Sequence, residues 1–165
     1  MYALRPLILL FPLLLAACGG YSFGGGDYSV LPEEYRKMAI AEVSNPTMYS
    51  WMEPRLRSLF RDELTRRDLV TWVDDRARAD ALMTINVIRF YRPDEVTGAE
   101  DETLRSSANI EMQVVIRSAR DGSVLWNSGN VAQSWPFFEG EQDQADQTVT
   151  ELAVRKIADR MSQNY

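Results

Sequence analysis

Residues 108–117, Ala-Asn-Ile-Glu-Met-Gln-Val-Val-Ile-Arg, alternate between apolar and polar side chains more regularly than any other segment of the chain. The apolar set that would share one face of a strand is Ala108, Ile110, Met112, Val114 and Ile116. The set on the opposite face is Asn109, Glu111, Gln113 and Arg117. This alternation predicts a β-strand with one covered face and one face in water, as in an antiparallel sheet.

The segments on either side of this strand continue the sheet. Residues 81–91 alternate in the same way and predict a strand that precedes it. After it, Asp121-Gly122 favours a tight hairpin turn, because glycine readily adopts the positive φ that such a turn needs. We expect a return strand from Val124 to about Trp135, with a bulge near Gly129.

Two amphipathic helices are predicted, one in each half of the chain. The first begins near Ser50, whose spacing to Glu53 is that of a capping box. Its apolar stripe is Met52, Leu56, Leu59, Phe60 and Leu64. The second begins near Asp143, and Asp146 adds negative charge to its first turn. Its apolar stripe is Val149, Leu152, Ala153, Ile157 and Met161.

Several arginines lie mostly off the apolar stripe of the first helix. They are Arg55, Arg57, Arg61, Arg66 and Arg67. We interpret them as a solvated helix face in preference to a binding surface.

The order of the predicted elements indicates the fold class. A first strand over residues 37–43 and a short edge strand over residues 70–73 flank the first helix, and residues 92–104 form a loop rich in acidic side chains. Strand, helix, several strands and helix predict an α+β two-layer sandwich, with two helices packed on a roughly four-stranded, mostly antiparallel sheet. A chain of 165 residues has room for one such domain, which we place at residues 33–165.

The amino-terminal residues 1–17 have the layout of a bacterial export signal peptide. A positive charge at Arg5 precedes an apolar run, residues 7–15, that is too short to span a bilayer. Leu15-Ala16-Ala17-Cys18 then resembles the lipobox of bacterial lipoproteins, in which the cysteine thiol accepts the lipid. We predict that Cys18 is lipidated; the alternative is a plain signal peptide with an incidental cysteine.

The residues that follow the lipobox predict attachment to a membrane. Residues 18–32 are rich in glycine and are expected to form a flexible, lipidated tether. Two or more acyl chains hold a protein on a bilayer durably, whereas one chain binds only marginally. The residue after the cysteine is Gly19 and not an acidic residue. In lipoproteins this favours the outer membrane, with the body on its periplasmic side.

Composition restricts the chemistry of the chain. The sequence has no histidine and a single cysteine, so the usual proton shuttle, the commonest metal ligand and an internal disulfide are missing. A formal net charge of −6 argues against nucleic acid as a partner. Residues 20–24 match the G-x-S-x-G pattern of hydrolases, but no strand precedes them and no histidine can serve as base. We predict no catalytic residue, no metal, no cofactor and no enzyme activity.

Several short motifs, taken in order, resemble the lipopolysaccharide-assembly lipoprotein family of the LptE type. Beyond the lipobox, Leu31-Pro32 leads into Tyr35-Arg36-Lys37-Met38-Ala39-Ile40. Residues 61–67, Arg-Asp-Glu-Leu-Thr-Arg-Arg, end the first helix, and Ala79-Asp80-Ala81-Leu82 enters a strand. The resemblance covers nearly all of the chain after Cys18, and the order and spacing of the motifs carry it.

The resemblance implies a structure and a function. Members of that family fold as two helices against a four-stranded sheet. They lie inside a large outer-membrane β-barrel, the lipopolysaccharide translocon of the LptD type, where they plug the barrel and assist its assembly. Some members also contact lipopolysaccharide. The alternative function is that of a periplasm-facing lipoprotein that binds a small ligand or peptidoglycan on its wet sheet face.

The resemblance also singles out one residue for contact with lipopolysaccharide. A basic residue on the strand after the long loop has this role in some members, and Arg105 falls at that place. A guanidinium suits a phosphate group, although a strand-end arginine without this role is the alternative. A second basic residue is expected before the last helix, where this chain has Glu139, Glu141 and Asp143. The departure favours the barrel plug over direct binding of lipopolysaccharide.

Overall fold

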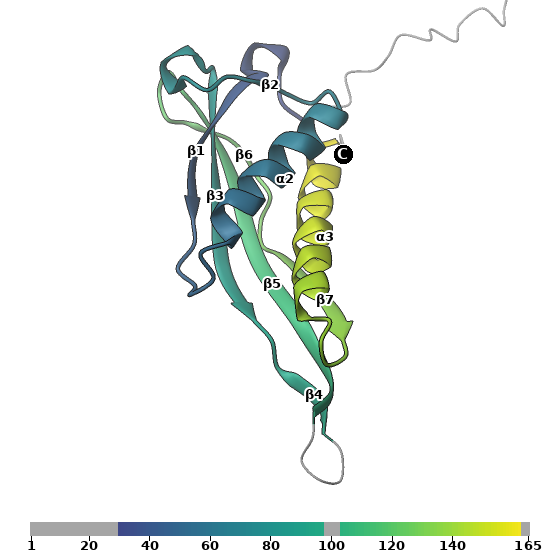
Figure 1. Cartoon of the computed structure of the whole chain (residues 1–165). Helices are drawn as coiled ribbons and strands as arrows, with labels where there is room; N and C mark the ends of the chain where they lie inside the picture. Colours follow the sequence, from purple (N-terminus) through teal and green to yellow (C-terminus); the bar gives the residue numbers. More distant parts are fainter. Residues whose placement is uncertain (1–29, 98–102, 163–165) are drawn as a thin grey trace, which may run out of the picture.

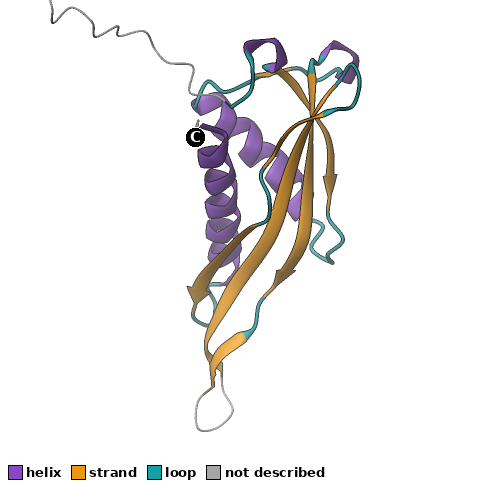
Figure 2. Cartoon of the chain, turned by 180° about the vertical axis from the view of Figure 1, so that it is seen from behind, coloured by secondary structure: helices purple, strands orange, loops and turns teal. Residues whose placement is uncertain are grey.

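A computed structural model describes residues 30–97 and 103–162 as two helices packed on one face of a curled sheet (Figures 1 and 2). The predicted signal peptide, Cys18 and most of the predicted tether lie outside these residues. The elements, in chain order, are η2 Glu33–Tyr35, β1 Lys37–Ser44, α2 Met52–Arg66, β2 Thr71–Trp72, η3 Arg76–Arg78, β3 Ala81–Tyr91, β4 Asp94–Thr97, β5 Thr103–Ser118, β6 Val124–Asn127, β7 Val131–Phe137 and α3 Gln142–Ser162. The α+β class is confirmed.

The segment that opened the sequence analysis lies in β5, the central strand. On one side β5 pairs antiparallel with β3 and, farther along, with β4; on the other side it pairs antiparallel with β6 and β7. The face predicted to be covered is buried along its whole length, from Ala108 to Ile116. The strands predicted over residues 81–91 and 108–117 are confirmed.

The sheet is mixed and has more strands than predicted. The described residues form a seven-stranded sheet, in which β1 pairs parallel with both β2 and β3. The reason lies in the connection: α2 crosses over the sheet between β1 and the strands that follow, and such a crossover brings the next strand back in the same direction. Side-chain alternation reports which face is buried and carries little information about strand direction.

Two predicted segments are divided differently in the structure. The return strand after Gly122 is split into β6 and β7 at Gly129, which has a φ of 62°. Ser128, beside it, bonds to β5 through its side chain, because the Val114 N–H donates to the Ser128 Oγ at 2.8 Å. The region 92–104, predicted as a loop, contains β4 and the first residues of β5.

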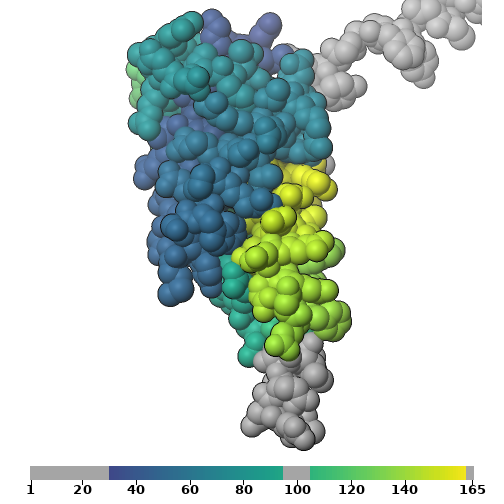
Figure 3. Space-filling model, in the orientation of Figure 1, coloured from purple at the N-terminus to yellow at the C-terminus, as the bar shows by residue number. Residues whose placement is uncertain are grey.

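Both helices bury the predicted apolar stripes. Figure 1 shows α2 and α3 on the same face of the sheet, and in Figure 3 the atoms of the two segments adjoin on this side of the molecule. Every predicted stripe residue is buried except Leu59 and Leu152, which are half-buried. The predicted capping box of Ser50 and Glu53 is wrong, because no side chain caps α2. Instead the Tyr49 carbonyl accepts from the Met52 N–H at 3.1 Å, so a backbone turn starts the helix.

The described chain begins at the carboxyl end of α3. The Val30 N–H donates to the Met161 carbonyl at 3.0 Å, and Leu31 is 2% exposed. Both residues belong to the segment predicted as tether, and both pack on the body of the domain. The opposite end of the molecule is the hairpin of β4 and β5, which extends beyond both helices (Figure 1).

Candidate functional site

The residue singled out for contact with lipopolysaccharide lies on the projecting hairpin. Arg105 is exposed in β5 and pairs with Val96 of β4. The next pairs along the hairpin are Asp94 with Ser106 and Thr97 with Thr103. The predicted strand position of Arg105 is therefore confirmed, and the hairpin of β4 and the start of β5 lies at the end of the body opposite the carboxyl end of α3 (Figure 1).

An ion pair lies at the base of this hairpin. The guanidinium of Arg92, directly after β3, donates to the carboxylate of Asp146 in α3 through Nε at 2.9 Å and Nη2 at 2.5 Å. The side chain of Asp146 is 8% exposed. Such a two-point contact fixes the orientation of both groups as well as their separation.

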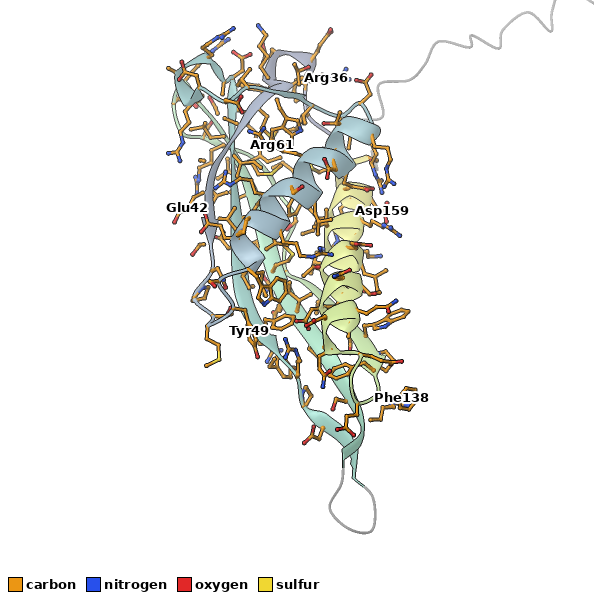
Figure 4. All side chains as sticks on the ribbon, in the orientation of Figure 1. Arg36, Glu42, Tyr49, Arg61, Phe138 and Asp159 are labelled. Carbon is orange, nitrogen blue, oxygen red and sulfur yellow. The ribbon has the colours of Figure 1, made fainter. Side chains whose placement is uncertain are left out.

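Aromatic rings surround the guanidinium of Arg92. The Arg92 Cζ lies 5.1 Å from the ring centre of Tyr49 and 5.6 Å from that of Phe90. Tyr49, beside the start of α2 (Figure 4), packs edge-on against Phe90 at 4.8 Å, and Trp51 does so at 5.8 Å. The hydrogen bonds that Arg92 donates to Asp146 raise the pKa of Arg92 above its ordinary value, so the guanidinium stays charged in this setting. We call Arg92, Asp146, Tyr49 and Phe90 the hairpin clamp.

The sequence analysis missed the role of Asp146. The sequence predicts only that Asp146 adds favourable negative charge to the first turn of the helix. In the structure its carboxylate accepts hydrogen bonds from Arg92, which lies 54 positions earlier in the chain. Asp146 lies three residues before Val149 and therefore on the buried stripe of the helix. This position is the sequence signal for an ion pair, because a carboxylate on a buried helix face requires a partner. Nothing local in the sequence identifies Arg92 as that partner.

A second buried carboxylate lies at the other end of the helix layer. Glu63 of α2 is 7% exposed and accepts from Arg67 Nε at 2.7 Å, and also from Arg66. Arg67 also contacts Asp159 of α3 at 2.7 Å (Figure 4). Burial alone would lower the pKa of Arg67, but the hydrogen bonds that it donates to Asp159 and Glu63 outweigh this effect and raise the pKa. This group ties the carboxyl end of α2 to α3.

The arginines of α2 are thus links within the molecule and only partly a solvated face. Arg55 donates to Thr150 at 2.9 Å and contacts Glu151 at 3.2 Å, joining α2 to α3. Arg61 contacts Asp74, after β2, at 2.8 Å. Because their donors are engaged inside the chain, these arginines do not form a prepared surface for an anionic ligand.

The outer face of the sheet is the alternative ligand site, and its polar side chains also bond to one another. A depression of about 220 Å³ lies there, lined in part by Tyr91 and Asn109. At its edge, the carboxylate of Glu111 accepts from Arg89 at 2.7 Å and from Asn130 at 3.0 Å. These contacts join β3, β5 and the start of β7, which accounts for the polar residues of this face without a ligand.

Two general properties of the described residues complete the description. Within residues 30–97 and 103–162, no helix combines the length and apolar character needed to cross a bilayer. Over the same residues, acidic side chains do not come together in any group of three or more that could hold a metal ion.

The family of the chain follows from comparison with known proteins. The family model for LptE, described as lipopolysaccharide-assembly, matches residues 35–163. Because the match spans most of the sequence, the chain belongs to the LptE family, a family of non-enzymatic lipoproteins of lipopolysaccharide assembly. The resemblance noted from the sequence motifs is confirmed. No curated protein sequence matches the chain significantly.

Solved structures share the fold at low sequence identity. Rare lipoprotein B from Shewanella oneidensis aligns with a TM-score of 0.52 at 10% identity, covering 76% of this chain and 93% of that one. Uncharacterized lipoprotein B from Nitrosomonas europaea gives 0.51 at 13% identity, covering 87% and 90%. The PelC dodecamer from Paraburkholderia phytofirmans gives 0.57 at 11% identity, covering 82% and 94%. At such identities the likeness concerns the fold alone.

Glu63→Gln should lower the free energy of unfolding by about 2 kcal/mol, because it removes one of the two carboxylates that Arg67 contacts at 2.7 Å and the buried charge that accepts these bonds. The matched control is Glu53→Gln on the same helix, whose pair with Arg57 is 3.5 Å long and exposed. That control should cost less than about 1 kcal/mol. Urea titration of both variants measures the difference, and equal losses would contradict the assignment of Glu63 as a structural centre.

Proposed function

We propose that this chain is an outer-membrane lipoprotein that plugs the β-barrel lipopolysaccharide translocon and assists its assembly. The observation that carries the proposal is membership of the LptE family over residues 35–163, together with the lipobox that ends at Cys18. In this proposal Cys18 carries the lipid anchor, the residues between Cys18 and the body are the tether, and the partner is a barrel of the LptD type.

The distribution of polar and apolar side chains over the body is compatible with a barrel lumen. Its charged side chains are linked to one another across the surface, and its large apolar side chains are concentrated between the helices and the sheet. A porin-like lumen is polar, so a plug for it needs a polar periphery around a self-sufficient core. The family function thus requires no catalytic group on this surface.

The two ends of the body have different roles in the proposal. The chain enters at Val30, beside the carboxyl end of α3, so a lipid on Cys18 would hold that end near the bilayer. The hairpin that bears Arg105 lies at the other end (Figure 2). Because a guanidinium pairs well with phosphate, we propose that Arg105 contacts lipopolysaccharide there.

Affinity purification of the full lipidated chain in mild detergent should recover a large β-barrel protein in equal amount. The Cys18→Ala variant should recover little of it, because the chain then lacks the lipid that brings it to the membrane. Mass spectrometry identifies the partner and the acylation of Cys18. Recovery of the wild-type chain alone, or a free thiol at Cys18, would count against the proposal.

Arg105→Glu should weaken binding of purified lipopolysaccharide by about tenfold, the effect of removing one charge-assisted contact. Arg117→Glu is the matched control, since Arg117 is exposed on the same strand near its opposite end. Circular dichroism should show both variants folded. Equal binding by the wild type and Arg105→Glu would remove Arg105 from the site.

A further inference from the structure

The β4–β5 hairpin is joined to the body along both arms: β5 is the continuation of the central strand and pairs with β7 as far as Ser106, whereas β4 follows a short connection. Only Arg92-Pro93 separates the end of β3 from the start of β4, and the hairpin continues past α3 and β7 (Figures 1 and 2). A two-stranded ribbon is marginally stable by itself in water. Its direction relative to the body therefore has to be held by contacts at its base.

The hairpin clamp supplies these contacts from several elements. Arg92 is bound at two points by Asp146 of α3 and lies over the rings of Tyr49, before α2, and Phe90, in β3. The connection is thus joined to α3, to the segment before α2 and to the sheet, two residues before β4 begins. Asp146 is almost fully buried, so without the guanidinium of Arg92 its carboxylate would be a buried and unpaired charge.

A line of hydrogen bonds continues from the clamp into the hairpin. The residue after Arg92 is Pro93, whose carbonyl accepts from the Ser107 N–H at 3.2 Å. The hydroxyl of Ser106 then donates to the Asp94 carboxylate at 3.1 Å. Ser106 is the neighbour of Arg105 in β5, so hydrogen bonds connected by short stretches of backbone lead from α3 to the residue beside Arg105.

We propose that Arg92 and Asp146 are positioning residues that set the direction of the β4–β5 hairpin and thereby present Arg105. The planar guanidinium fork, held by two hydrogen bonds, restricts rotation of the connection, which apolar packing of equal area would not do. The consequence for ligand binding rests on the proposed contact of Arg105 with lipopolysaccharide. The consequence for the hairpin itself does not depend on that contact.

Hydrogen exchange of the full chain in detergent, followed by mass spectrometry, tests the clamp. Asp146→Asn keeps the shape of the side chain and removes its charge, and should speed exchange of amides at 94–97 and 103–106 by about tenfold relative to the rest of the sheet. Arg92→Lys keeps the charge and loses the fork, and should produce a smaller increase at the same amides. It also provides a folded variant if Asp146→Asn is too unstable to purify.

Glu63→Gln is the matched control, because Glu63 is a carboxylate of equal burial that also holds arginine, at the opposite end of the helix layer. It should leave the hairpin as protected relative to the sheet as in the wild type. If neither Asp146→Asn nor Arg92→Lys speeds exchange selectively in the hairpin, the positioning role is overturned. The same result in Glu63→Gln as in Asp146→Asn would also overturn it, since the effect would then be general destabilisation.

Binding of purified lipopolysaccharide separates this inference from the proposed function. Asp146→Asn should weaken binding severalfold while opening the hairpin, whereas Arg105→Glu should weaken binding with the hairpin still protected. If the hairpin opens in Asp146→Asn but Arg105→Glu binds as the wild type does, the clamp is supported and the contact by Arg105 is contradicted.

Discussion

The long strand β5 is the constraint on which the other elements depend, because four strands pair with it directly. β3 and β4 occupy one side of it in succession, and β6 and β7 occupy the other. Its inward face, from Ala108 to Ile116, is buried in the one core to which both helices contribute, and α3 packs directly against this strand. β7 pairs with β5 as far as Ser106, and beyond it residues 103–105 of β5 pair with β4 alone, which produces the projecting hairpin (Figure 1). One strand therefore both organises the core and carries the candidate site.

Buried carboxylates secure the two ends of the helix layer on the sheet. Glu63 holds Arg66 and Arg67 where α2 ends, and Asp146 holds Arg92 where α3 begins. Buried ion pairs of this kind contribute little net stability, but they fix relative orientation, because removal of one partner leaves the other buried and unpaired. This arrangement explains how an arginine-rich helix can belong to a chain with a formal net charge of −6.

The sequence predicts those parts of the structure that follow from periodicity. The alternation of residues 108–117 and 81–91, the turn at Gly122 and both apolar helix stripes are found as expected. The parallel pairing of β1 could not be predicted, because it depends on the path of α2 over the sheet. The clamp was missed for a similar reason: Asp146 and Arg92 meet only when the completed sheet brings α3 beside the end of β3. Arg105 was found through family resemblance, since an exposed arginine on a strand has no distinctive local pattern.

The proposed function joins these features in one account: a lipid at one end, a self-contained polar body, and a hairpin that carries Arg105 at the other end. The most direct test is to measure lipopolysaccharide on the cell surface after depletion of this chain in the organism that makes it. The account predicts that surface lipopolysaccharide falls and returns when the wild-type chain is restored. Unchanged surface lipopolysaccharide after complete depletion would contradict it.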